Sequence, residues 1–240
     1  MGLKEKHFSE LEVILLGGSY GAFNFEVIRH FNIFNTFLED SEIILKMRKL
    51  ELSKKHQNEI DKLDWTDIGY QSGELYELQK EFELRHISIY DVLFNSTFLG
   101  SFGLFESSLR ILFWKLNQID PKEYTTHKSI KWGITELQTQ FKKQLNIDFD
   151  VCDIWAKILD YKEIRNSITH RNGGICLNTN DLLLDNLTYK SVISIGNNIQ
   201  FNENELQLKI LNKNFISDFI FVVFTFYKEL ENSNQLNFPN

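Results

Sequence analysis

The sequence reads Y-K-E-I-R-N-S-I-T-H-R-N-G-G over residues 161–174, and no other segment gathers as many chemically capable side chains in so few positions. The stretch continues a helical pattern of apolar residues from upstream, and its two final glycines are typical of a helix end. Arg165, Asn166 and His170 therefore fall in about the last two turns of a helix whose other face is apolar. This predicts a helical domain that presents a cation, an amide and an imidazole at one helix tip.

Most of the remaining chain also favours helices. Only two prolines occur in 240 residues, and Leu, Ile, Phe, Lys and Glu are abundant. Asp150 is expected to cap the helix that carries residues 161–174. Apolar residues at helical spacing predict further helices over residues 41–63, 74–117, 129–145 and 214–230. The expected fold class is mainly α, a helical bundle.

Three segments are expected to differ from this pattern. Residues 190–201, K-S-V-I-S-I-G-N-N-I-Q-F, hold a Gly-Asn-Asn turn between β-branched runs, which predicts a small β-hairpin before the last helix. Residues 65–73 are expected to form a loop. Residues 17–21, G-G-S-Y-G, lack the spacing of a nucleotide-binding loop, so a plain turn is expected there.

The apolar pattern also suggests a division of the chain. Residues 1–73 are interpreted as an N-terminal extension, and residues 74–240 as the helical domain. The extension is expected to contain one amphipathic helix that packs on the bundle through Ile43, Met47, Leu50, Ile60 and Leu63.

Two close pairs of residues stand out in the segment 74–117. Gly100 and Gly103 remove side chains from one side of the helix, which predicts either two helices that meet there or one long helix with a close neighbour. Glu106 and Arg110 lie four residues apart, so an ion pair on one helix face is expected, and a surface pair is the plainer interpretation.

Composition excludes several classes of function. The net charge is −7 and the isoelectric point about 5.4, so the whole molecule does not attract nucleic acid or an anionic membrane, and an anionic partner would need a local patch. The two cysteines lack metal-site spacing, and H-E-x-x-H is absent, so neither a metal nor a cofactor is expected. We expect no secretory leader and no membrane span, and a cytoplasmic location.

The residues of the helix tip have the chemistry that RNA cleavage without a metal requires. Imidazole exchanges a proton near neutral pH, and guanidinium binds phosphate oxygens and stabilises developing charge. Arg165 and His170 are five residues apart, however, which is roughly 140° around a helix axis. Either the helix unwinds near Thr169, or a second chain supplies the complementary groups. A plain helix end, where cations offset the helix dipole, is the structural alternative.

Arg165-Asn166-x-x-x-His170 at a helix end resembles the R-x(4–6)-H signature of the HEPN superfamily, the higher-eukaryote-and-prokaryote nucleotide-binding domains. The preceding long helix with Glu106 and Arg110 and the final apolar helix also fit, so the resemblance covers roughly residues 75–230. The tyrosine that follows the histidine in members controlled by nucleotidylation is absent here.

The resemblance implies a helical bundle that dimerises so that two tips form one composite site. Many members are metal-independent endoribonucleases that cleave tRNA or mRNA as toxins or antiphage abortive-infection effectors, some with an antitoxin or regulatory protein. Arg165 and His170 would then be the catalytic pair, Asn166 their support, and Arg171 a substrate-binding residue. The alternative is a dimer without catalysis that serves as a nucleotide- or protein-binding subunit.

Overall fold

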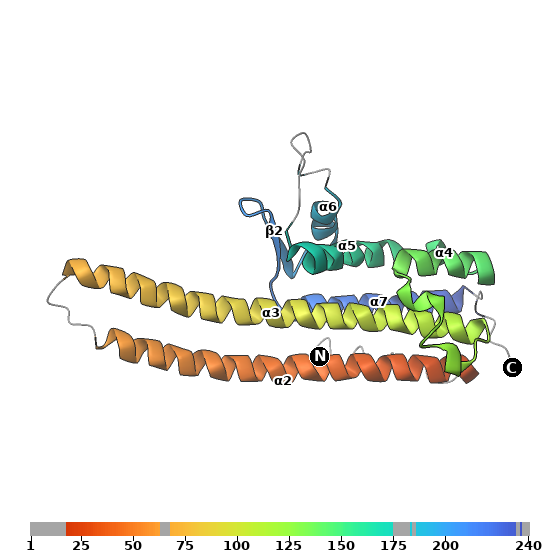
Figure 1. Ribbon diagram of the computed structural model, residues 1–240, viewed down its shortest axis with the longest axis horizontal. Coiled ribbons are helices and arrows are strands. Elements are labelled where there is room, and N and C mark those ends of the chain that lie inside the picture. Colours follow the sequence, from red (N-terminus) through yellow and green to blue (C-terminus); the bar gives the residue numbers. More distant parts are fainter. Residues whose placement is uncertain (1–17, 63–67, 175–182, 184–185, 234–235, 237–240) are drawn as a thin grey trace.

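The computed structural model describes residues 18–62, 68–174, 183, 186–233 and 236, and it confirms a mainly helical fold (Figure 1). Two long antiparallel helices, α2 (Gly18–Ile60) and α3 (Ile68–Leu116), lie side by side. Shorter helices cover the later part of α3. These are α4 (Ile134–Leu145), α5 (Trp155–Arg171) and α7 (Asn214–Asn232).

The helices α2 and α3 are longer than the apolar pattern predicts. Residues 18–21 and 68–73 are helical, so the expected turn and loop are wrong there, while residues 17 and 63–67 lie outside the described part. Glycine lowers helix propensity by only about 1 kcal/mol, and packing over such long helices outweighs that cost. The division at residues 73 and 74 falls within α3, and the division itself stays a prediction.

The glycines of α3 do not break the helix. At Gly100, an added Cβ would lie 2.9 Å from a ring carbon of Phe34 on α2, whereas at Gly103 it would meet no atom within 4 Å. One long helix with a close neighbour is therefore the correct alternative of the two, and Gly100 alone makes the close approach.

The segment between α3 and α5 is less regular than expected. The predicted helix over residues 129–145 is wrong at its start, because a short 3-10 helix, Lys128–Lys131, precedes α4, and Ile130 is exposed. Asp150 does not cap α5. It lies within a second 3-10 helix, Phe149–Val151, whose capping side chain is Asp148.

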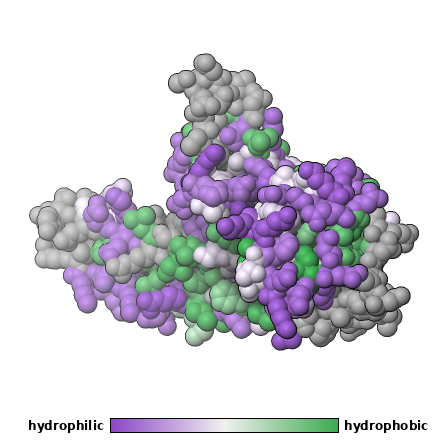
Figure 2. All heavy atoms as spheres, turned by 45° about the vertical axis from the view of Figure 1, so that its right-hand side comes forward, coloured by the Kyte–Doolittle hydropathy of each residue, from purple (hydrophilic) through white to green (hydrophobic). Residues whose placement is uncertain are grey.

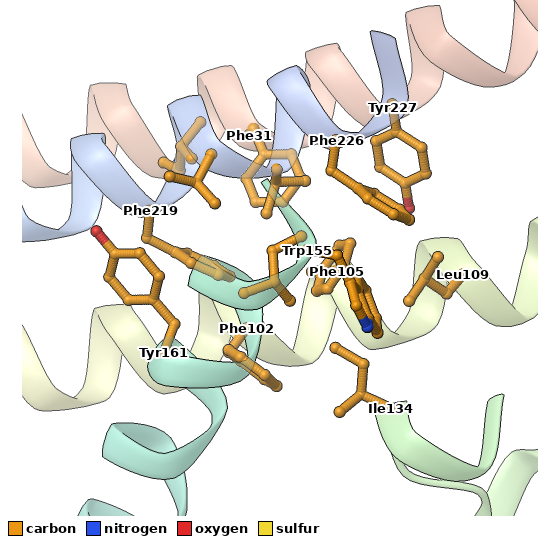
Figure 3. Packing of buried hydrophobic residues seen from close by; sticks show 14 of the residues in the cluster. Phe31, Phe102, Phe105, Leu109, Ile134, Trp155, Tyr161, Phe219, Phe226 and Tyr227 are labelled. Carbon is orange, nitrogen blue, oxygen red and sulfur yellow. The ribbon is translucent and has the colours of Figure 1, made fainter. Parts of the chain in front are cut away.

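A cluster of aromatic residues forms the core where α3, α5 and α7 meet (Figure 3). Phe219 of α7 stacks on Phe102 of α3, with ring centres 5.4 Å apart, and its ring also contacts Phe98 and Tyr161. The apolar face predicted for the last helix is confirmed, since each of the six residues predicted to form it is buried. These are Phe215, Phe219, Val222, Val223, Phe226 and Leu230.

The small antiparallel sheet before the last helix is confirmed, but the predicted position of its hairpin is wrong. Residues 187–195 form α6 (Leu187–Ile195), which ends at Gly196 with φ 74°. The strands are β1 (Ile199–Asn202) and β2 (Gln207–Ile210), paired so that Ile199 lies opposite Ile210. The β-branched run before the glycine is helical because α6 packs against α5, where two serines of α6 donate to Asp160.

The extension packs on the bundle through a different face from the one expected. Ile43, Met47 and Leu50 of α2 are exposed, whereas Phe31 and Leu38 are buried. Among the described residues, no helix is both long and apolar enough to span a membrane.

Candidate functional site

The tip of α5, residues 165–174, is the end of this helix and contacts the sheet. As predicted, it ends at the glycines: Arg171 is the last helical residue, Asn172 is left-handed with φ 51°, and Gly173 follows with φ 81°. A Cβ on Gly173 would lie 3.1 Å from the carbonyl oxygen of Leu208 on β2. The backbone N–H of Leu208 donates to the carbonyl of Gly173 at 2.8 Å, so the sheet holds the tip in place.

Arg165 is held by three contacts. Its Nη2 donates to Oε2 of Glu106 at 3.2 Å, and its Nη1 donates to Oδ1 of Asn166 at 3.0 Å. The guanidinium carbon lies 5.5 Å from the centre of the Phe102 ring, within the range of a cation–π interaction. The side chain is 28% exposed. Arg165 is therefore fixed between α5 and α3 but still reaches solvent.

The carboxylate of Glu106 contacts two arginines, Arg110 and Arg165. Its Oε2 lies 3.9 Å from Nη2 of Arg110, so the expected ion pair is confirmed, although it is largely buried rather than a surface pair. Arg110 also donates to the carbonyl of Trp132 at 2.9 Å. Burial lowers the pKa of Arg110. The carboxylate of Glu106 opposes that shift, whereas the charge of Arg165 lowers the pKa further. Two guanidinium groups share one carboxylate here, which leaves a surplus of positive charge in an acidic protein.

His170 and Arg171 are exposed on the last turn of α5. Within the described part of the chain, no residue forms a hydrogen bond or ion pair with either side chain. Both groups are thus accessible to a ligand, in contrast to the half-buried Arg165.

One chain does not bring the two predicted catalytic groups together. The helix continues through Thr169, whose Oγ1 donates to the carbonyl of Arg165 at 2.9 Å, so the alternative that the helix unwinds there is wrong. Arg165 and His170 remain roughly 140° apart around the axis. Asn166 is bound to Arg165, and within the described residues it makes no hydrogen bond to His170. Two alternatives remain, a second chain that supplies the complementary groups and a plain helix end where cations offset the helix dipole.

Sequence reasoning missed that Glu106 contacts Arg165, because the two residues are 59 positions apart. A signal was present. Glu106 is a carboxylate beside Phe105, on a helix whose neighbouring residues Phe102 and Leu109 are fully buried. A buried carboxylate requires a cationic partner, and Arg110 alone leaves one side of the Glu106 carboxylate without such a partner.

The described residues contain no other strong candidate for catalysis. No group of three or more His, Cys, Asp or Glu side chains among them could hold a metal ion. Burial, together with the charges of the nearby Glu229 and Asp153, raises the pKa of Cys152 to about 11, so this thiol is protonated at neutral pH.

Comparison with protein-family models, with curated proteins and with solved structures gives no match. The resemblance of Arg165, Asn166 and His170 to the HEPN signature therefore stays a prediction. Function has to be argued from the site itself.

Proposed function

We propose that the chain is a metal-independent endoribonuclease with a bundle of the HEPN type, and that the tip of α5 is its active site. The observation that supports this best is the exposure of His170 and Arg171 on the same helix end as a guanidinium held by Glu106 and Asn166. A proton-transfer group and fixed positive charge thus occur together, which is what phosphodiester cleavage requires.

In this proposal His170 takes the proton from a ribose 2′-hydroxyl. The 2′-oxygen then bonds to phosphorus, the bond from phosphorus to the 5′-oxygen breaks, and the protonated imidazole of His170 from a second copy of the chain donates its proton to that oxygen. Arg165 stabilises the charge on the phosphoryl oxygens, Asn166 orients the guanidinium, and Arg171 binds a neighbouring phosphate.

The geometry of one helix supports a second copy as the source of the missing groups. Two α5 tips related by a two-fold axis would place His170 of one copy near Arg165 of the other, which a single helix does not allow. The proposed homodimer would act in the cytoplasm on tRNA or mRNA, as a toxin or an antiphage abortive-infection effector. An antitoxin or regulatory protein would restrain it.

The test is cleavage of total tRNA and mRNA in the presence of EDTA. His170→Ala and Arg165→Ala are expected to lower the rate at least ~100-fold, the usual contribution of a general base or charge-stabilising group. His30→Ala on α2 is the matched control, because it removes an exposed imidazole remote from α5. Cleavage that persists in both site variants, or that EDTA abolishes, would overturn the proposal.

One observation favours the alternative of a binding subunit without catalysis. The carboxylate of Glu106 offsets part of the charge of Arg165, which weakens the attraction of this guanidinium for a phosphate. Under this alternative, RNA or a nucleotide binds to the tip without being cleaved, and Arg171→Ala lowers its affinity while no substitution changes the length of the RNA.

A further inference from the structure

The helix α2 has two apolar faces. One packs against the bundle through buried residues that include Val27, Phe31 and Leu38. The other lies on the opposite side of the helix and consists of six large side chains that are between 51% and 66% exposed in the whole chain. They are Ile33, Phe37, Ile43, Ile44, Met47 and Leu50.

This outer face has the spacing of a coiled-coil seam. Four of the six residues lie on positions that alternate by three and four along α2, the polar Thr36 and Asp40 occupy the other two positions, and Phe37 and Ile44 flank them. The seam positions are Ile33, Thr36, Asp40, Ile43, Met47 and Leu50. A helix that is apolar on opposite sides needs a neighbour on each side. The described elements pack on only one side of α2.

This face extends along much of α2. Its six side chains are each more than half exposed and lie between residues 33 and 50, about 25 Å of helix. A stable interface buries about 800 Å² on each partner, which requires an extended contact of this kind. Figure 2 shows hydrophobic atoms reaching the lower edge of the molecule, where α2 lies in Figure 1.

We propose that this face pairs with the same face of a second copy of the chain, as an antiparallel two-helix coiled coil centred between residues 41 and 42. In this register Ile33 lies opposite Leu50 of the second copy, and the flanking Phe37 lies opposite Ile44 of the second copy.

Charge decides the direction of the pair. In the antiparallel register, Glu39 at the rim lies near Lys46 of the second copy, and the two-fold axis repeats this contact. A parallel pair in register would place Asp40 against Asp40 of the second copy inside the seam, where two carboxylates repel, whereas the antiparallel register places each Asp40 opposite Ile43 of the second copy.

This contact differs from the one that the proposed active site needs. In Figure 1, α2 lies on the other side of α3 from α5, so a pair formed through α2 leaves both α5 tips accessible. The two contacts are independent, and the experiment below does not involve catalysis.

The test is disulfide trapping between two variants, Ile33→Cys and Leu50→Cys, each in a Cys176→Ser background, where the buried Cys152 is the one other cysteine. When the two are mixed and oxidised, the antiparallel pair brings the new thiols within reach of a disulfide, and a covalent dimer of two 28.4 kDa chains forms. Either variant alone is expected to give almost none, because identical positions 33 or 50 then lie about 25 Å apart along the seam.

A charge in the seam provides the second measurement. Met47→Glu, added to both variants, is expected to lower the yield of covalent dimer at least ~10-fold, while the exposed control Lys49→Glu leaves it unchanged. Circular dichroism verifies that each variant is folded. The inference is wrong if the mixture gives no covalent dimer at roughly 50 µM chain, if each variant alone links as well as the mixture, or if Met47→Glu leaves the yield unchanged.

Discussion

The two halves of α3 have very different surroundings. In the later half, Phe98, Phe102 and Phe105 are fully buried, because α5 and α7 cover them (Figures 1 and 3). In the earlier half, Leu84 is 59% exposed, since α2 is the main neighbour among the described elements. Both halves belong to one continuous helix rich in apolar residues, so burial here depends on which elements fold over the helix and not on its own composition.

The largest expected effect breaks the packed half. Phe219→Ala removes a ring that contacts four other aromatic residues, so the free energy of unfolding should fall by about 3–5 kcal/mol. Urea denaturation followed by circular dichroism measures the change. Leu84→Ala in the open half is the control, and it should alter the same quantity by less than about 0.5 kcal/mol. Equal losses would show that the two halves do not differ in stability.

The next effect tests whether the charges in the packed half are structural. Glu106→Gln leaves Arg165 and Arg110 close together without their shared carboxylate, so unfolding should become easier by about 2–3 kcal/mol. Glu51→Gln on α2 is the matched control, because Glu51 pairs with Arg48 and Lys55 in solvent, and no measurable change is expected. If Glu106→Gln leaves the free energy of unfolding unchanged, the two arginines do not require this carboxylate.

A smaller effect compares two glycines on the same helix. Gly103→Ala should stabilise the protein by up to about 1 kcal/mol, since alanine favours helix and its Cβ meets no atom within 4 Å. Gly100→Ala should lack this gain, because Phe34 must first move away. The difference between the two melting temperatures measures the close approach of α2 to α3. Identical melting temperatures of the two variants would contradict the close approach of α2 to α3.

The smallest effect concerns the ion pair that joins α2 to α7. The hydrogen bond from Lys213, together with the charges of Lys213 and Lys46, lowers the pKa of Glu42 below 4.5, and partial burial opposes the shift. The ionised carboxylate therefore stabilises the fold fully above pH 4.5, and this contribution is lost as the pH falls through the lowered pKa. Glu42→Gln should cost less than about 1 kcal/mol at neutral pH, because the pair is solvated. As the pH falls below the lowered pKa of Glu42, the unfolding curves of the variant should converge with those of the parent chain, and a difference that persists would exclude this pair as its cause.

Local patterns were sufficient for elements whose signals lie within one segment. The last helix has an apolar residue at every third or fourth position, and the end of α5 is marked by two adjacent glycines. Both follow from backbone conformation and helical periodicity, which need no distant partner. The position of the hairpin could not be predicted in this way, since residues 190–195 favour strand locally and are helical only because α6 packs on α5.

By itself, the sequence determined that the chain is mainly helical, and it determined which residues form the tip of α5, because helix ends depend on neighbouring residues. Only the tertiary structure decided which apolar face of α2 is buried, since both faces have suitable residues and packing on α3 selects one. It also decided the surroundings of Arg165. The carboxylate that holds this residue comes from another helix, and contacts between residues so far apart in the chain arise from the fold.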